Sequence, residues 1–157
     1  WGLDHGAWSV LLHLVPNADV PVVQMSLDRG KTPTEHVALA KSLTALRRRG
    51  VLIVGSGNMV HNLRRVAWDR LNQVGFAYDW ATEAHAVLME RVRGQRLDEL
   101  AQYARLGSAV QFAIPTPEHY LPMLYALSLR EPDEALEVFN DYALAGSLTM
   151  TSLALGA

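Results

Sequence analysis

The chain of 157 residues is long enough for one domain, and 50% of its residues are hydrophobic, which is enough to build a core. Its 14 basic and 16 acidic side chains leave a formal charge of -2 with no long run of either sign, so the charge favours neither nucleic acid nor an anionic membrane as a partner. The absence of cysteine excludes disulfides, thiolate nucleophiles and cysteine-based zinc sites, which leaves histidine and carboxylate as metal ligands.

The sequence contains neither a candidate membrane span nor a secretory leader. No apolar run reaches the roughly 20 residues that cross a bilayer, and no basic stretch followed by an apolar one opens the chain. We therefore expect a soluble, cytoplasmic protein. The chain opens at Trp1 without a methionine, in a polar, glycine-containing stretch typical of the middle of a protein, so we expect a fragment or a processed chain.

The first third of the chain is predicted to form a strand, a helix and a second strand. Residues 20–27 follow a short apolar segment and are rich in β-branched side chains, which is typical of a buried strand. Residues 32–35 read Thr-Pro-Thr-Glu, a capping box that predicts the start of a helix, and Gly50 predicts its end. The apolar run 51–54 predicts the next strand, and two strands joined by a helix favour parallel pairing with a right-handed crossover.

The rest of the chain is predicted to be mostly helical. Residues 79–104 have helical spacing in two pieces, and a cap residue followed by proline predicts another helix at 119–129. Segments 137–142 and 147–151 have the alternation of half-buried strands. We therefore predict an α/β fold in which a mixed, mostly parallel sheet is flanked by helices, a three-layer α/β/α arrangement, with a single domain over residues 1–157.

Three of the six histidines are candidates for chemistry. His5, His61 and His119 lie at a loop or a helix start beside glycine, asparagine or proline, where the backbone can present a side chain to a cleft. Imidazole binds iron and zinc and exchanges protons near neutral pH. His61 follows a glycine-rich turn at the sheet edge where ligands bind in open α/β folds, and Asp4 could orient the neighbouring imidazole. Helix capping or a core hydrogen bond is the alternative for each candidate. The other three histidines are predicted to be structural residues within helices: His13, His36 and His85.

Five motifs stand in order along almost the whole chain. They are W-G-L-D-H-G-A-W at 1–8, P-V-V-Q-M-S-L at 21–27, G-S-G-N-M-V-H-N-L at 55–63, T-P-E-H-Y-L-P at 116–122 and G-S-L-T-M at 146–150. Together they resemble the class III extradiol ring-cleavage dioxygenases, and among these the 4,5-DOPA dioxygenase branch. Several ordered matches are more specific than any single motif.

The resemblance implies an oxidoreductase of aromatic compound metabolism that opens a catechol ring, DOPA-like, with dioxygen at a mononuclear non-haem metal site. Iron(II) is expected for activity, and zinc is an alternative occupant. His119 would be a metal ligand, His61 either a second ligand or the acid–base residue for a substrate hydroxyl, and His5 a hydrogen-bond partner of substrate or oxygen. The resemblance also marks three residues for contact with substrate, the last of them also a reserve metal ligand: Asp4, Asn58 and Glu118.

One part of the family pattern is missing. The Gly-His-Gly-Ser-Pro and Ser-Ala-His-Trp segments, each with a metal-ligand histidine, do not occur in this chain. The chain therefore resembles the C-terminal portion of such an enzyme, and we expect the other half of the metal site to be encoded before Trp1. Alone, the chain is predicted to bind metal weakly and turn over little or not at all. An N-terminal fragment of the same protein or a homo-oligomer is the expected partner. A non-enzymatic binding or scaffold protein that kept the fold and a zinc hydrolase with the same histidines stay open as alternatives.

Overall fold

The computed structural model describes residues 2–156, which divide into two compact units. The first unit ends at Gly30, and the second begins at Lys31. Trp1, the first residue of the first motif, lies outside the described residues. The single domain over residues 1–157 stays a prediction.

The first unit consists of one helix and an irregular segment. Helix α1, His5–Leu14, begins after Asp4, whose carboxylate accepts a hydrogen bond from the Ala7 backbone N–H at 2.9 Å. None of the α1 side chains is buried. The strand predicted at 20–27 is wrong, because these residues carry no regular secondary structure. A strand needs a neighbour to satisfy its backbone hydrogen bonds, and this unit offers only a helix.

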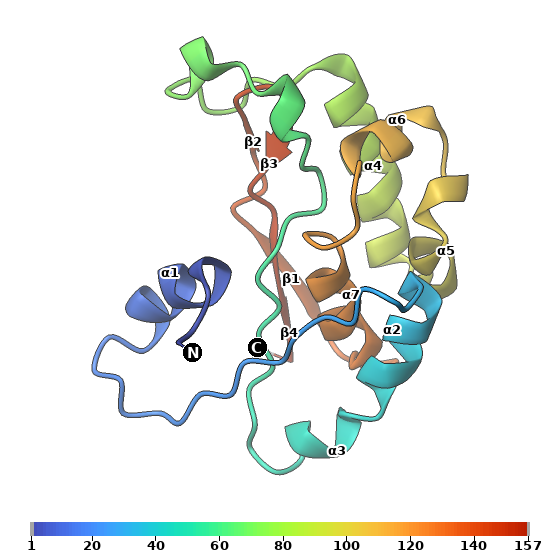
Figure 1. The fold of residues 1–157 in the computed structure, drawn as a ribbon. Coiled ribbons are helices and arrows are strands. Elements are labelled where there is room, and N and C mark those ends of the chain that lie inside the picture. The colour runs from blue at the N-terminus through green and yellow to red at the C-terminus, as the bar shows by residue number, and fades with distance from the viewer. Residues whose placement is uncertain (1, 157) are drawn as a thin grey trace. The chain divides into compact units, whose positions relative to one another are not determined.

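Most of the regular secondary structure of the second unit is helical (Figure 1). Its helices are α2 Pro33–Lys41, α3 Thr44–Arg47, α4 Asp79–Arg93, α5 Leu97–Ala101, α6 Ser108–Ala113 and α7 Leu121–Ser128, with short 3-10 turns at Leu63–Arg65, Trp68–Arg70 and Tyr103–Arg105. The capping box of α2 is present as predicted. The helix expected to continue to Gly50 is interrupted after Lys41, and α6 was not predicted. Within residues 2–156, no helix combines the length and the apolar character needed to cross a membrane.

The core of the second unit lies between these helices. Helix α4 packs on α6 and α2 on α7. The helical spacing of residues 79–104 predicts four buried side chains: Leu88, Val92, Leu97 and Leu100. Three of them are buried, and Leu97 is only partly buried. His36 is also fully buried, with its Nδ1 atom 2.8 Å from the hydroxyl of Tyr125. This contact links α2 to α7 and agrees with the structural role predicted for His36.

The strands of the second unit form two small antiparallel sheets. Strand β1, Leu136–Phe139, pairs with β4, Ser152–Leu155, and β2, Ala143–Leu144, pairs with β3, Leu148–Thr149. The described chain is therefore a mixture of helices and small antiparallel sheets. The strand predicted at 51–54 is not formed, and with it the parallel strand–helix–strand unit, because no described segment supplies a backbone partner to residues 52–54.

The β2–β3 hairpin holds two of the loops that precede it in sequence. His61 forms an isolated bridge with Leu148, and Ala77 forms one with Gly146. Gly146 has a φ of 79°, and a Cβ there would lie 2.6 Å from the ring of Tyr78. Only glycine suits that backbone and that close contact, so the glycine of the G-S-L-T-M motif is what lets the hairpin and the loop meet.

Candidate active site

The loop after residues 51–54 is pressed against the start of α7. A Cβ on Gly55 would collide with the carbonyl oxygen of Pro122, and a Cβ on Gly57 with that of His119. The backbone N–H of Asn58 donates to the same His119 carbonyl at 2.6 Å. The two glycines therefore permit a contact between backbones that brings His61 next to His119.

The two imidazoles are stacked face to face. Their ring centroids are 4.1 Å apart and their planes differ by 18°. Coplanar rings could not come this close, so one ring lies above the other. The lone pair of an imidazole nitrogen lies in the plane of its ring, and here the two planes are nearly parallel. The two lone pairs therefore cannot both point at one ion, and at most one of these histidines is a metal ligand in this arrangement.

The surroundings of the imidazole pair favour an uncharged His61. Burial lowers the pKa of His61, and the nearby His119 lowers it further by repulsion between like charges. Glu118 opposes this shift, since its carboxylate favours a protonated ring. Glu118 Oε1 lies 3.8 Å from His119 Nδ1 and accepts a hydrogen bond of 2.7 Å from the hydroxyl of Thr116. Glu118 thus acts on the pair through charge, because 3.8 Å is too long for a hydrogen bond.

The backbone around His61 is fixed from two sides. The His61 N–H donates to the carbonyl of Ala113, at the end of α6, at 2.9 Å. On the other side, the bridge to Leu148 and a bond from the Thr149 N–H to the Val60 carbonyl attach the segment to β3. Since successive side chains alternate along such a segment, buried Val60 and Asn62 leave His61 on the partly exposed face.

Asn58 is engaged in holding the loop. Its side-chain oxygen accepts from the Val60 N–H at 3.1 Å and lies 3.4 Å from the hydroxyl of Thr149. The side-chain oxygen of Asn58, a residue that the resemblance marks for substrate contact, therefore stabilises the turn before His61.

Asp4 and His5 belong to the first unit and are described within it. Asp4 caps α1 with one carboxylate oxygen and accepts from the side chain of Gln24 at 2.6 Å with the other. His5 is the first residue of α1, and its ring meets that of Trp8 edge to face with centroids 5.3 Å apart. Both carboxylate oxygens of Asp4 are thus engaged in hydrogen bonds, one with the first turn of α1 and the other with Gln24.

The remaining histidines have contacts typical of structural residues. His85 Nε2 lies 2.9 Å from Asp141 Oδ1 and 3.0 Å from the hydroxyl of Thr151, which joins α4 to the strand region. His13 is exposed in α1. Across residues 2–156, no three histidine, aspartate or glutamate side chains gather closely enough to hold a metal ion.

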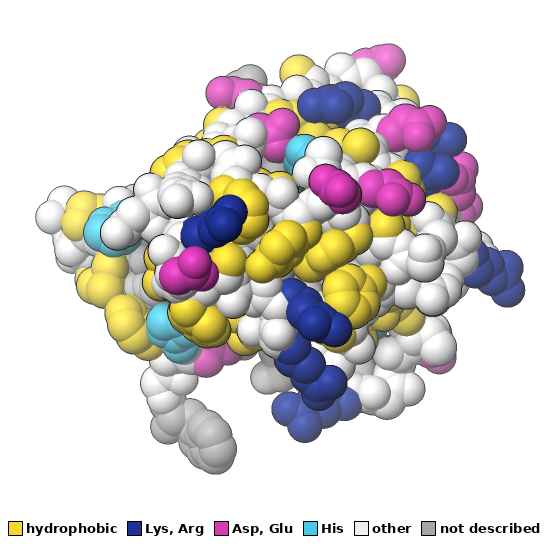
Figure 2. Space-filling view, turned by 90° about the horizontal axis from the view of Figure 1, so that it is seen from above, with side chains coloured by type: hydrophobic (Ala, Val, Ile, Leu, Met, Phe, Trp, Pro, Cys, Tyr) yellow, Lys and Arg dark blue, Asp and Glu magenta, His cyan; other side chains and the backbone are white. Residues whose placement is uncertain are grey.

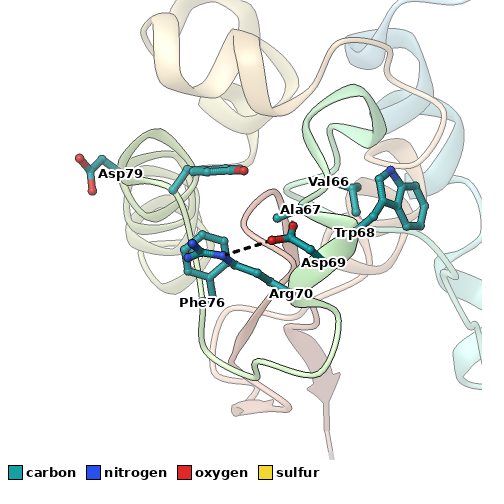
Figure 3. Close-up of a pocket in the computed structure, with 9 residues that line it drawn as sticks. Val66, Ala67, Trp68, Asp69, Arg70, Phe76 and Asp79 are labelled. Atoms are coloured by element: carbon teal, nitrogen blue, oxygen red, sulfur yellow. Dashed lines mark ion pairs between the residues drawn. The ribbon is translucent and has the colours of Figure 1, made fainter.

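Two features of the second unit were not foreseen in the sequence. Ser147 in the G-S-L-T-M motif is fully buried, and its hydroxyl is the buried side-chain oxygen that lacks a hydrogen-bond partner within the described residues. An open pocket of about 870 Å³ lies along residues 66–70 and 76–79 (Figure 3). The spacing of aromatic residues from Trp68 to Trp80 was a signal that could have pointed to this second surface.

The profile of the family described as "Catalytic LigB subunit of aromatic ring-opening dioxygenase" matches residues 1–150. The chain belongs to this family, which confirms the resemblance of its motifs.

Proteins similar to the chain come from bacteria, plants and fungi. It is 38% identical to the 4,5-DOPA dioxygenase extradiol of Escherichia coli (strain K12), over 99% of this chain and 57% of that protein. It is 32% identical to the protein of the same name from Beta vulgaris, over 89% of this chain and 51% of that protein. It is 44% identical to "Dioxygenase tasH" of Hapsidospora irregularis, over 89% of this chain and 46% of that protein.

A solved structure has the same fold. It is the crystal structure of an uncharacterized protein from Escherichia coli K12, which is 36% identical and superposes with a TM-score of 0.87 over 98% of this chain and 62% of that chain. The chain therefore spans about half to three fifths of the length of the relatives it matches.

Proposed function

We propose that the protein to which this chain belongs is an extradiol dioxygenase that opens the ring of a DOPA-like catechol at a mononuclear non-haem metal site. Family membership and the names of the relatives support ring-opening dioxygenase chemistry. The observation that carries the proposal for this chain is the stacked pair His61 and His119, one from each of two family motifs, held together by contact between their backbones.

His119 is proposed as the metal ligand and His61 as the acid–base residue beside it. His119 is half exposed at the start of α7, with Glu118 near its Nδ1 atom. The stacked arrangement allows only one of the two imidazoles to bind the metal. His61 is the more buried and more firmly held of the two, so we assign the metal to the more exposed His119. Bound iron(II) would supply the electron transfer between catechol and dioxygen, with zinc as an alternative occupant. His61 would take the proton of a substrate hydroxyl and later return one to the opened product.

His5, Asp4, Asn58 and Glu118 are proposed in supporting roles. His5 would donate a hydrogen bond to substrate or dioxygen, and Glu118 would hold the His119 imidazole in orientation through its charge. The side-chain amide N–H₂ of Asn58 would face substrate, since its oxygen is engaged in the turn. The Asp4 carboxylate already caps α1, so we propose that it acts indirectly, through His5, rather than by direct contact with substrate.

The remaining part of the fold is proposed to come from an N-terminal part of the same protein. The relatives are longer than this chain, and residues 52–54 are apolar, free of regular secondary structure and without backbone partners among the described residues. Val51, Leu52 and Val54 are exposed. A strand paired with this run would begin the mostly parallel sheet of the three-layer arrangement, and the same part would bring the missing histidine ligands.

The experiment is oxygen uptake after anaerobic loading with iron(II), measured with a panel of catechols on the chain joined to its N-terminal part. His119→Ala and His61→Ala should each lower the rate more than a hundredfold, while His13→Ala, an exposed histidine of α1, leaves it unchanged. His119→Ala should lose iron, whereas His61→Ala should keep it and lose the pH dependence of turnover. Uptake within tenfold of the parent in either site variant would sink the assignment, and hydrolysis without oxygen consumption would point to the zinc hydrolase.

A further inference from the structure

Asn62 is a buried polar residue directly after His61, and the proposed mechanism gives it no role. Figure 2 shows charged side chains at the surface of the molecule, where water can form hydrogen bonds with them. The side chain of Asn62 lacks this access to water, because the residue is only 4% exposed. Burying an amide is unfavourable unless its donors and its acceptor are hydrogen-bonded. The hydrogen bonds of Asn62 therefore indicate why the chain buries an amide at this position.

Asn62 connects segments that are distant in sequence. Its Nδ2 atom donates a hydrogen bond of 2.7 Å to the backbone carbonyl of Phe112, in α6. Its Oδ1 atom accepts one of 3.2 Å from the backbone N–H of Arg64 and so caps the 3-10 turn that follows. The backbone N–H of Asn62 donates to the carbonyl of Ser147, in the β2–β3 hairpin, at 3.3 Å. Asn62 thus joins the segment of His61 to α6 and to the hairpin.

The end of α6 holds this segment at two adjacent points. The backbone N–H of His61 donates to the carbonyl of Ala113 at 2.9 Å, and the side chain of Asn62 donates to the carbonyl of the preceding residue, Phe112. The last carbonyls of a helix have no partners within the helix, so these two are available. A single hydrogen bond would let the segment turn about that contact. Two bonds to adjacent carbonyls fix the direction of the segment as well as its position.

The carboxamide of Asn62 suits these two contacts chemically. The side chain must donate to a carbonyl oxygen and accept from a backbone N–H, and an uncharged carboxamide does both. An ionised aspartate of the same shape only accepts, and a leucine of similar size does neither. Successive side chains of an extended segment point to opposite sides, so the amide of Asn62 reaches the interior while the ring of His61 lies on the partly exposed face.

We propose that Asn62 is a positioning residue for His61 in the ring-opening reaction, an inference that rests on the proposed function. By attaching the segment to α6, Asn62 keeps the imidazole of His61 stacked on that of His119, with the ring centroids 4.1 Å apart. Proton transfer needs a defined distance and angle between donor and acceptor. Loss of the Asn62 contacts should therefore slow the proton transfers of His61 and leave the metal, which is assigned to His119, in place.

Oxygen uptake with a catechol tests this role in the iron-loaded chain joined to its N-terminal part. Asn62→Leu removes both side-chain hydrogen bonds, and Asn62→Asp loses the donor to Phe112 while it keeps the shape. Each variant should lower kcat about a hundredfold, with KM within about twofold of the parent and an unchanged iron content. Tyr125→Phe, which removes a buried hydrogen bond between α2 and α7, is the matched control and should keep kcat within about twofold.

The imidazole resonances of the 157-residue chain test the positioning without any need for activity. Asn62→Leu and Asn62→Asp should shift the ring resonances of His61 and His119 and leave those of His36 unchanged. Tyr125→Phe should do the reverse, because the Tyr125 hydroxyl lies 2.8 Å from Nδ1 of His36.

Hydrogen exchange in the parent chain does not depend on the folding of a variant. The Nδ2 protons of Asn62 should exchange with solvent at least a hundredfold more slowly than those of the exposed Asn72. Equally fast exchange would overturn the inference, and so would a parent-like kcat or unchanged His61 resonances in both Asn62 variants. A kcat lowered together with loss of iron would also overturn it, because the effect would then lie on the metal. A parent without oxygen uptake would refute the proposed function instead, and the resonances and the exchange rates would still decide whether Asn62 holds His61.

Discussion

Replacing Gly57 by alanine tests whether the contact between the two backbones sets the geometry of the imidazole pair. The new Cβ would run into the carbonyl oxygen of His119 and would also lie 3.2 Å from Cγ of Pro122. The first obstacle is backbone, which cannot rotate away as a side chain can. The loop must therefore move off α7, and His61, four residues further on, should move with it.

The cost follows from what this displacement breaks. Forcing an extra methyl into a packed contact costs about 1–3 kcal/mol, and the hydrogen bond from Asn58 N–H to the His119 carbonyl, worth about 1 kcal/mol, would stretch. We expect the free energy of unfolding in urea to fall by about 2–4 kcal/mol. The ring resonances of His61 and His119 should shift in the NMR spectrum. In the parent chain the two ring centroids are 4.1 Å apart, so each ring affects the chemical shifts of the other.

Gly2→Ala is the matched control, because nothing lies within 4 Å of the new Cβ and the backbone there needs no left-handed conformation. It should change neither stability nor the histidine resonances. If Gly57→Ala behaved like this control in both measurements, the two backbones would not be in the contact described, and the stacked pair would lose its physical basis.

Three further substitutions test other parts of the second unit. Tyr125→Phe removes the buried hydrogen bond to His36 and should lower the free energy of unfolding by about 1–2 kcal/mol in urea titrations. Glu134 has its pKa lowered by a hydrogen bond from Arg47, so this ion pair stabilises the fold above the ordinary glutamate pKa of about 4.3 and is lost as the pH falls below it. Glu134→Gln should cost about 2 kcal/mol at pH 7 and flatten the acid side of the stability profile, and an unchanged profile would contradict the pairing. Ser147→Ala removes a buried hydroxyl without a partner and should raise the melting temperature, whereas a lowered one would mean that the hydroxyl is satisfied.

Helices with strong local signals could be predicted from the sequence. The capping box at Thr32 fixes the start of α2, and Gly94 marks the end of α4, although the left-handed backbone that follows the helix is at Gln95, with a φ of 54°. Such signals act between residues a few positions apart, so they need no knowledge of the rest of the fold. Helix α6 lacks them, since no side chain caps its first turn, and it was missed.

The strands were predicted only in part, because each depends on a partner elsewhere in the chain. The predicted segments 137–142 and 147–151 overlap β1 and β3, whereas 20–27 and 51–54 form no strand. The run 51–54 has the composition of a buried strand, but composition does not supply the neighbouring backbone. The β2–β3 hairpin, in contrast, has strands of only two residues and forms because Gly146 can adopt a positive φ and accept two aromatic rings beside it. Neither outcome can be deduced from residues considered one at a time.

Two members of the candidate site were chosen together from the sequence, and their roles stay predictions. Motif context brought His61 and His119 forward together, and the structure places them in contact. The sequence left open whether His61 binds metal, because that choice depends on the angle between two rings from distant segments. Asn58 and Asp4 were chosen for their polar side chains, whereas the partners that engage them are a backbone N–H of the turn and the distant Gln24.

The position of the imidazole pair depends on the apolar run 51–54, because the same segment of chain continues from this run to His61. The run leads directly into Gly55 and Gly57, which hold the chain against α7, and only four residues separate Gly57 from His61. A strand paired with residues 51–54 would fix the backbone just before this contact and so limit the motion of the imidazole behind it. If the N-terminal part supplies both that strand and the missing ligands, completing the sheet and completing the metal site are one event. Metal affinity and folding stability should then rise together when that part is added.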